Sequence, residues 1–412
     1  MMQYFRRVIS ASLSPNTEVD DVAVAWWRLF SPLSWKNGRD IGAVEAWFQN
    51  YFDAPRAVSF DSGRSALLAL LASFGIHKGD EVIVQAFTCV AVPNAVIWSG
   101  AKPVFADIDA SLNIDPLQLP KLLSSKTKAI IVQHTLGIAA SMDKILAFAK
   151  KHKLLVIEDC AHSLGVLHNG KKIGTFGDAA FFSFGRDKVL SSVWGGMAII
   201  HDQEDHKDAM ENLAQYQSRL AQPAATWIAQ QLLHPILFST IIPLYNSGIG
   251  KFLLVLLQKL HMLSFPVQPL ELRGVQPMSA KRYPNALATL LMHQLPKLIK
   301  YSNNRAEIVS YYSSALKNKG FTFAKHEGNV NLLRFPLLVK NPDLYKKRAK
   351  SHGILLGNWY SNVIDPASCD MNRIGYNMGS CPNAEHTALN ILNLPTRITL
   401  ADARRIVDVL CL

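Results

Sequence analysis

The stretch FFSFGRDKVLSSVWGG, residues 181–196, contains one lysine among mainly apolar, hydroxyl and glycine residues. A lysine amine can form a Schiff base with a carbonyl group and can then carry protons. Ser183 precedes Lys188 at the end of an apolar run, and Gly195 and Gly196 allow close approach of the backbone before the next run. Because a lone lysine is nearly always a solvated surface group, this stretch indicates chemistry only together with other residues.

A second stretch, VIEDCAHSLG at residues 156–165, ends an apolar run with Glu158 and Asp159, and His162 follows. Ligands of an α/β sheet bind outside the carboxyl ends of its strands, so an acid at this position faces a cleft. A carboxylate there can hold a cationic heterocycle and favours its protonated form. The alternatives are a helix cap or a surface ion pair, and this stretch alone does not decide between them.

A third stretch, FDSGRSALLALL at residues 60–71, runs from a turn at Gly63 straight into a helical pattern with Arg64 and Ser65 in its first turn. Free N–H groups and the positive end of the helix dipole suit this position to a phosphate. The glycine could equally serve only to turn the chain. In chain order, the three stretches supply a phosphate site, an anion for a ring nitrogen and an amine.

The elements that must position these residues show the pattern of an α/β fold. Short apolar runs alternate with amphipathic segments from about residue 60 to 200, which predicts a mainly parallel sheet covered by helices on both faces. The runs are continuous rather than alternating, as expected of strands buried on both faces. Helices are predicted after Gly63, ending at Gly75, and after Ser141 as N-cap. The predicted strands are 81–87, 102–108, 129–135, 154–160, 179–184 and 196–200.

Two domains are expected, a large one over residues 1–274 and a smaller C-terminal α/β domain over 275–412. The smaller domain begins with a linking helix that is interrupted at Pro296 and stops at Gly320. Its predicted strands are 321–325, 332–339 and 354–360, and its last predicted helix is 400–410.

The segment 224–263 is more apolar than one helix face requires. Pro243 and Gly248 divide it into blocks shorter than the roughly eighteen apolar residues of a spanning helix. It could therefore form a buried helical hairpin or a dimer contact. A peripheral membrane contact through residues 232–263 is a second interpretation, since Lys251 and Lys259 could meet lipid headgroups, and a transmembrane hairpin is a third.

Composition excludes several classes of protein. The net charge is +12, but no run of five basic residues occurs, so no nucleic-acid partner is expected. The 5 cysteines include no CxxC spacing, so neither a disulfide framework nor a metal site is predicted. Residues 1–16 lack the long apolar core of a secretory signal. A cytoplasmic protein, with the membrane contact as a possible addition, is the expectation.

Taken together, these motifs resemble the pyridoxal-phosphate-dependent sugar aminotransferases of the DegT/DnrJ/EryC1/StrS group, which have the aspartate aminotransferase fold, fold type I. The resemblance is carried by SGRSALLALL, KGDEVIVQAFTCVAVPNAVIWSGAKPVFADID, VIEDCAHSLG, GKKIGTFGDAAFFSFGRDK, WGG and NLPTRITLADARRIVDVL. It implies that Lys188 binds the cofactor pyridoxal 5'-phosphate and moves protons, and that Asp159 pairs with the pyridinium nitrogen. His162 would lie near the ring oxygen. The resemblance further implies a phosphate cradle, which we define as Gly63, Arg64, Ser65 and Ser183.

Three features depart from the pattern of the family. Cys89 stands where many relatives place an aromatic residue on the cofactor ring, and Phe87 is a possible substitute. The Asn-x-Arg stretch by which a second subunit reaches the phosphate is not evident, and Gln276 in GVQPMSAKR is a weak candidate for it. Arg64 replaces a common threonine, and its charge would strengthen anion binding if the side chain turned inward.

The resemblance implies a homodimeric aminotransferase that moves an amino group from an amino acid, with glutamate as the expected donor, to a nucleotide-linked ketosugar. A pyridoxal-phosphate-dependent sugar dehydratase is the alternative enzyme. Because a histidine replaces the lysine in the dehydratase branch, Lys188 favours transamination. A third hypothesis, prompted by Cys89 and the apolar segment, is a sensor or membrane-associated scaffold with the same fold.

Overall fold

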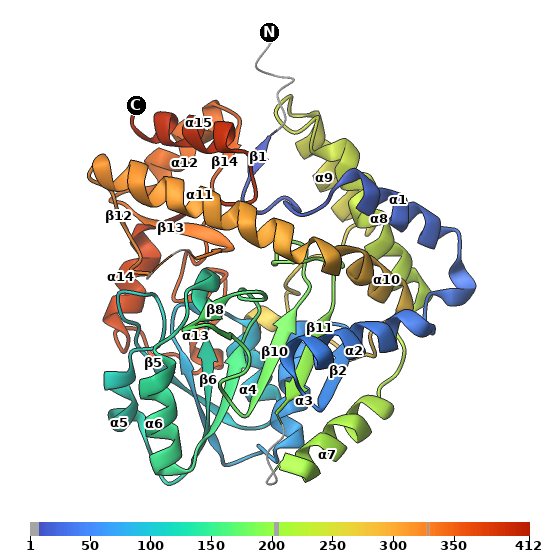
Figure 1. The fold of residues 1–412 in the computed structure, drawn as a ribbon, viewed down its shortest axis with the longest axis vertical. Helices are drawn as coiled ribbons and strands as arrows, with labels where there is room; N and C mark the ends of the chain where they lie inside the picture. The colour runs from blue at the N-terminus through green and yellow to red at the C-terminus, as the bar shows by residue number, and fades with distance from the viewer. Residues whose placement is uncertain (1–7, 202–205, 327, 329) are drawn as a thin grey trace.

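The computed structural model of the chain describes residues 8–201, 206–326, 328 and 330–412 (Figure 1). Its largest sheet has 7 strands in the order β2-β11-β10-β7-β6-β3-β5. All neighbouring strands are parallel except β11, which is antiparallel to both β10 and β2. The strands are β2 (Arg56–Phe60), β3 (Glu81–Gln85), β5 (Lys102–Ala106), β6 (Thr127–Gln133), β7 (Leu155–Asp159), β10 (Ala179–Ser183) and β11 (Gly196–Ile200).

Both faces of this sheet are buried, as the continuous apolar runs predicted. Successive residues of β3 show it, because Ile83 packs on one side while Val82 and Val84 pack on the other. Helices α3 (Gly63–Ser73), α4 (Ala91–Trp98) and α7 (Lys207–Ser218) cover the second side. The first side is covered by α2 (Arg39–Phe52), α5 (Leu119–Leu122), α6 (Met142–His152) and α10 (Asn285–Gln294).

The six strands predicted between residues 81 and 200 are all present, and the two predicted helices are α3 and α6. Ser141 is the N-cap residue of α6, although its side chain makes no capping hydrogen bond. The sequence pattern did not identify β2, nor α1 (Val19–Leu29) and α2 before it. The predicted fold class, α/β with a mainly parallel sheet, is confirmed.

A smaller unit follows, built on a sheet in the order β12-β13-β16, with β12 (Thr322–Phe323), β13 (Arg334–Leu338) and β16 (Ile391–Pro395). The linking helix is α11 (Leu298–Asn318), separated from α10 by a 3-10 turn, η7 (Leu295–Lys297), at Pro296. Helices α12 (Pro342–Ser351), α14 (Pro382–Asn390) and α15 (Leu400–Leu410) complete it.

The amino-terminal strand joins this smaller unit. Strand β1 (Ile9–Ser10) pairs in parallel with β14 (Ile354–Leu355), and Ile9 is buried in the same core as α11 and α15. The prediction of a strand over 354–360 was too long, because the chain turns away after Leu355. The domain boundary at residues 274 and 275 stays a prediction.

The apolar segment forms a helical hairpin of α8 (Ala225–Ile241) and α9 (Ile249–Lys259). Helix α8 packs against α1 and α10, whereas α9 lies at the outside of the molecule (Figure 1). Among the residues that the structure describes, no helix combines the length and hydropathy that crossing a bilayer requires.

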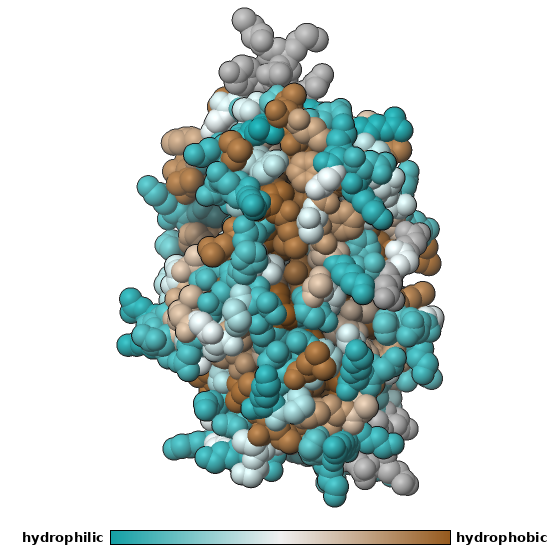
Figure 2. Space-filling view, turned by 90° about the vertical axis from the view of Figure 1, so that its left-hand side faces the viewer, coloured by the Kyte–Doolittle hydropathy of each residue, from teal (hydrophilic) through white to brown (hydrophobic). Residues whose placement is uncertain are grey.

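The opposite side of the molecule, where Figure 1 places α5, α12 and α14, is shown in Figure 2. Apolar residues form a band through its middle, between hydrophilic flanks. The large exposed apolar side chains of these elements occur singly, as Leu344 in α12 and Leu389 in α14. Isolated exposed apolar residues of this kind are normal on a protein surface.

Candidate active site at the carboxyl edge of the sheet

The structure brings Lys188, His162 and Asp159 together at the carboxyl edge of the sheet. Asp159 is the last residue of β7, and Ser183 is the last residue of the neighbouring strand β10. The loops that leave these strands carry His162 and Lys188, and Lys188 Nζ lies 3.1 Å from His162 Nε2. Asp159 is close enough for its charge to favour the protonated form of the lysine. The alternation of strands and crossings therefore assembles residues that the sequence only placed in order.

The hydrogen bonds of His162 indicate the protonation state of this pair. The backbone N–H of Leu136 donates to Nδ1, at 3.2 Å. Burial holds the pKa of His162 well below its ordinary value, so the ring is neutral and its proton is on Nε2. That N–H then points at Lys188 Nζ and needs a lone pair there. Since burial also lowers the pKa of Lys188, the amine can offer this lone pair.

Asp159 is 4% exposed, and the hydrogen-bond donor to its side chain is the backbone N–H of Ala161. Burial raises the pKa of its carboxyl group, and the N–H of Ala161, at 2.9 Å, together with the Lys188 charge offsets the effect only in part. A buried carboxylate with so few partners is stabilised most when a cationic ring nitrogen lies next to it.

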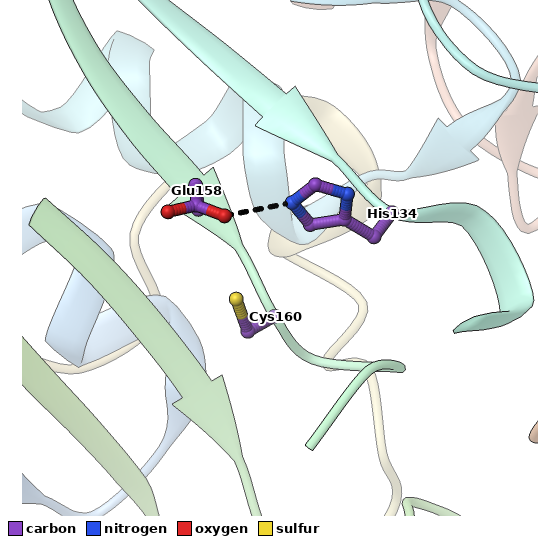
Figure 3. Close-up of side chains that lie close together, drawn as sticks. All are labelled: His134, Glu158 and Cys160. Carbon is purple, nitrogen blue, oxygen red and sulfur yellow. Dashed lines mark hydrogen bonds and ion pairs between the residues drawn. The ribbon is translucent and has the colours of Figure 1, made fainter. Parts of the chain in front are cut away.

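The adjacent residue Glu158 has the opposite environment (Figure 3). Its side chain accepts hydrogen bonds from His134 Nε2 at 3.1 Å and from the N–H groups of Gly174, Phe176 and Gly177 at 2.7 to 2.9 Å. These partners hold its pKa below the ordinary value in spite of burial. Glu158 therefore fixes the loop that leads into β10, and its role is structural.

Cys160 lies beside this pair, and the three side chains are close enough to one another to be examined as a metal site. His134 Nδ1 accepts from the N–H of Ala140 at 3.2 Å, so both ring nitrogens are already used. Both oxygens of Glu158 are used as well. A metal ion would have to replace these bonds, and the cluster is better explained as a buried hydrogen-bonded pair.

Two residues of the smaller unit, Arg334 in β13 and Trp359 after β14, close the site from the other side. Trp359 stacks on His162, with ring centroids 5.1 Å apart and an interplanar angle of 16°, and Lys188 Nζ lies 4.7 Å from its ring centre. The guanidinium of Arg334 also lies over the Trp359 ring, 3.4 Å from its centroid, and pairs with Asp187 at 2.7 Å. Sequence analysis missed both residues, because Arg334 and Trp359 fell in segments that it assigned to strands, 332–339 and 354–360.

Tyr360 completes this group, with its hydroxyl 3.5 Å from His162 Nε2. Phe87, the possible substitute for the missing ring partner, packs edge-on against Tyr360 with centroids 5.3 Å apart. Cys89 is close enough to Lys188 and Arg64 for their charges to lower its thiol pKa, although burial raises the pKa overall. The roles assigned to Phe87 and Cys89 stay predictions.

The proposed phosphate cradle forms around the start of α3. Ser62, which sequence analysis did not single out, is the N-cap and accepts from the N–H of Ser65 at 3.3 Å. The first hydrogen bond within the helix is donated by Ala66 to the carbonyl of Ser62. The N–H groups of Gly63 and Arg64 come before it and take no part in the hydrogen bonds of the helix itself. A Cβ at Gly63 would lie 2.9 Å from Ser183 Cβ, so only glycine lets the helix start this close to β10.

The Arg64 side chain does not turn into the cradle. Its guanidinium pairs with Glu271 and donates to the carbonyl of Pro266 at 2.7 Å. It also lies over the ring of Trp194, 5.3 Å from the centroid. The expected gain in anion binding from this charge is therefore absent in this conformation.

The backbone at Lys188 is held by a residue from the amino-terminal segment. Asn16, which is fully buried, donates through Nδ2 to the carbonyls of Lys188 and Val189. Its Oδ1 accepts from Arg305 at 2.9 Å, and Gln294 donates to its carbonyl at 3.0 Å. No local pattern marked Asn16, because the contact joins residues 172 positions apart.

Comparison with known proteins identifies the relatives of this chain. It matches the DegT/DnrJ/EryC1/StrS aminotransferase family over residues 28–227 and 276–410. It is 40% identical over 168 residues to GDP-perosamine synthase from Caulobacter vibrioides, covering 40% of this chain and 45% of that protein. It is 37% identical over 182 residues to dTDP-3-amino-3,6-dideoxy-alpha-D-galactopyranose transaminase from Aneurinibacillus thermoaerophilus, covering 44% and 50%. The chain thus spans about half the length of the curated relatives it matches.

Solved structures share the fold over nearly the whole chain. PseC, a Helicobacter pylori aminotransferase involved in the biosynthesis of pseudoaminic acid, has a TM-score of 0.75 at 21% identity and 98% coverage of both chains. S. venezuelae DesV in complex with a ketimine intermediate has a TM-score of 0.73 at 23% identity and 98% coverage of both. The same fold is seen in E. coli GDP-4-keto-6-deoxy-D-mannose-3-dehydratase, with a TM-score of 0.75 at 19% identity and coverages of 98% and 99%.

Proposed function

Because this chain belongs to the DegT/DnrJ/EryC1/StrS aminotransferase family, we propose that it is a pyridoxal-phosphate-dependent aminotransferase acting on a nucleotide-linked ketosugar, with glutamate as the amino donor. The observation that carries the proposal is the position of the Lys188 amine, 3.1 Å from His162 Nε2 and close to the Asp159 carboxylate, with burial lowering the pKa of the amine. The names of the relatives, GDP-perosamine synthase and an aminogalactose transaminase, support a sugar nucleotide as the acceptor.

The residues present fit the cofactor. The start of α3, where glycine allows contact with Ser183, suits a phosphate, and Asp159 suits a protonated ring nitrogen. Lys188 supplies the amine that reacts with the aldehyde. When bound, pyridoxal phosphate supplies an electron-withdrawing ring that stabilises negative charge on the substrate carbon.

In this proposal, the protein's own residues perform binding and proton transfer. Lys188 Nζ, whose pKa burial lowers, would move the proton between the substrate carbon and the cofactor. The N–H of His162 and the ring of Trp359 restrict where this amine can lie. Asp159 would keep the ring nitrogen of the bound cofactor protonated.

The proposal also includes the assembly and the location of the protein. It acts as a homodimer in the cytoplasm, with the excess of basic residues attracting the diphosphate of the acceptor and no role for nucleic acid. A peripheral membrane contact through residues 232–263 is part of the proposal and depends on the surface of α9.

The experiment that tests the function is a half-reaction without acceptor. Protein loaded with pyridoxal phosphate is mixed with glutamate, and its absorbance should shift to that of the pyridoxamine form. Borohydride reduction before glutamate is added should attach the cofactor to the peptide containing Lys188. Attachment at another lysine, or a spectrum unchanged by any amino donor, would contradict the proposal, and the second result would favour a sensor or scaffold.

The dehydratase alternative is tested in the same preparation. A transaminase consumes one donor amino group for each sugar aminated, whereas a dehydratase would remove a hydroxyl group from the sugar without stable transfer of nitrogen. Mass spectrometry of the sugar nucleotide after incubation with ¹⁵N-glutamate distinguishes the two. We expect the label in the sugar.

A further inference from the structure

The outer face of α9 carries a row of apolar side chains that the protein does not cover. Phe252 is 66% exposed, Ile249 54%, Val255 51%, Leu256 38% and Leu260 59%. Their spacing along the helix puts them on one side. A row of this kind on one helix differs from the single exposed residues on α12 and α14, and it marks an interaction site.

The inner face of α9 holds the helix to the protein, and the exposed apolar row is not needed for this packing. Leu253, Leu254 and Leu257 pack against a small core made by α8 and Leu263. Helix α8 in turn is buried against α1 and α10. The hairpin is therefore held to the body of the protein by its inner side, and the outer apolar residues add nothing to that packing.

The charges around α9 specify the kind of partner. No aspartate or glutamate occurs from residue 212 to residue 270, while Lys251 and Lys259 lie on α9 itself. An apolar helix face with flanking lysines and no carboxylate is complementary to an anionic surface with an apolar interior. This segment also falls in the gap between the two ranges that match the family, 28–227 and 276–410.

We propose that the outer face of α9 docks on the surface of an anionic lipid bilayer. Ile249, Phe252, Val255, Leu256 and Leu260 enter the boundary between headgroups and acyl chains, and the two lysines meet lipid phosphates. The helix lies in the plane of the surface, since its 11 residues cannot span the apolar layer.

A second copy of this chain is a poorer occupant. In a symmetric dimer contact the same face meets itself, which would bring Lys251 and Lys259 near their own copies without a carboxylate from this segment to neutralise them. An anionic bilayer satisfies both the apolar row and the lysines.

Vesicle flotation of the whole protein tests the proposal. The protein should float with phosphatidylglycerol vesicles and remain at the bottom with phosphatidylcholine vesicles, and high salt should weaken binding to the first. Phe252→Glu should reduce the bound fraction at least tenfold. Leu389→Glu, a substitution of a residue 72% exposed on α14, is the matched control, because it adds the same charge and should bind like the unaltered protein.

The outcomes separate docking from general attraction of a basic protein to anionic lipid. Equal loss of binding in both variants, or full binding by Phe252→Glu, would overturn the proposal. So would an oligomer without lipid that Phe252→Glu dissociates, because α9 would then contact another copy. The glutamate half-reaction of both variants reports whether the protein is folded, and it tests the proposed function independently of docking.

Discussion

Two buried polar clusters lie side by side at the ends of β6 and β7, and they differ in how completely their groups are paired. Glu158 has four donors and a lowered pKa, whereas the adjacent Asp159 has a raised pKa and one backbone N–H. Because successive residues of a strand point to opposite faces, one residue of difference separates a structural carboxylate from a candidate catalytic one.

The comparison shows that burial alone does not identify a functional group. A buried charge that is fully hydrogen-bonded stabilises the fold, while a buried group that lacks partners costs stability and gains it back when a ligand binds. The predictions that follow, from the largest expected effect to the smallest, test whether the two clusters are as different as their bonding indicates.

Replacing Lys188 by Ala removes the reacting amine and should reduce turnover by roughly 10⁴-fold, the upper end of acid–base catalysis by one group. The melting temperature should not fall, since a partly buried amine with a lowered pKa contributes little to stability. Initial rates of amino transfer, with Lys171→Ala as an exposed-lysine control, measure the effect. A variant that retains the unaltered rate would remove Lys188 from the mechanism.

Replacing Asp159 by Asn should lower turnover by about 10²- to 10³-fold, because the amide cannot hold a proton on the ring nitrogen. Stability should stay the same or rise, since a neutral amide replaces a poorly paired buried carboxylate. Rate and thermal unfolding are measured on the same preparation. A large loss of stability would mean that Asp159, like Glu158, stabilises the fold, and would contradict the comparison.

Replacing Glu158 by Gln should lower stability and leave turnover nearly unchanged, which is the reverse of the result expected for Asp159→Asn. Gln keeps one oxygen that can still accept from Phe176 and Gly177, but its NH2 group would face the N–H of Gly174 and the ring of His134, so the free energy of unfolding should fall by about 3 kcal/mol. Turnover of the remaining folded protein should change little. Denaturant unfolding gives the first quantity, and the rate per cofactor bound gives the second.

Replacing Asn16 by Ala removes both bonds to the carbonyls of Lys188 and Val189 and one partner of Arg305. We expect roughly tenfold slower turnover and a stability loss of about 2 kcal/mol, at about 1 kcal/mol for each donor bond. Asn16→Asp is the diagnostic comparison, because Asp can accept from Arg305 but cannot donate to the carbonyls. The second carboxylate oxygen of Asp would face the carbonyls of Lys188 and Val189, so Asp should recover neither the stability nor the rate if Asn16 acts through the bonds it donates.

The smallest effect is the pH dependence of stability. Burial keeps the pKa of His162 and of His234 well below the ordinary value, so below about pH 6.5 the unfolded chain binds protons that the folded chain does not. The free energy of unfolding should therefore fall as the pH falls, by up to about 1.4 kcal/mol per pH unit for each histidine. His162→Asn should reduce this slope in denaturant titrations; an unchanged slope would show that His162 titrates normally.

Local patterns were sufficient for much of the fold. Continuous apolar runs predicted six strands of the largest sheet, β3, β5, β6, β7, β10 and β11, and the interruption at Pro296 separated α10 from α11. They were insufficient where an element lacks a repeat of its own, as in the two-residue strands β1 and β14, which exist only because they pair with each other.

The candidate site divides in the same way. Lys188, Asp159, His162 and the start of α3 follow directly after predicted strands or turns, so their order along the chain was enough to place them at one edge. Trp359, Arg334 and Asn16 were missed because they reach the site from other parts of the chain. The pairing of Arg64 with Glu271 was likewise beyond reach of the sequence, as was the distinction between Glu158 and Asp159.

By itself, then, the sequence determined the class of fold and predicted which groups would react, because apolar periodicity and the residues at strand ends are properties of neighbouring positions. Only the tertiary structure decided which of those groups are paired, which are left to a ligand, and which face of α9 remains uncovered. The physical reason is that pairing and burial depend on side chains that meet across large separations in the chain, where no local pattern carries the information.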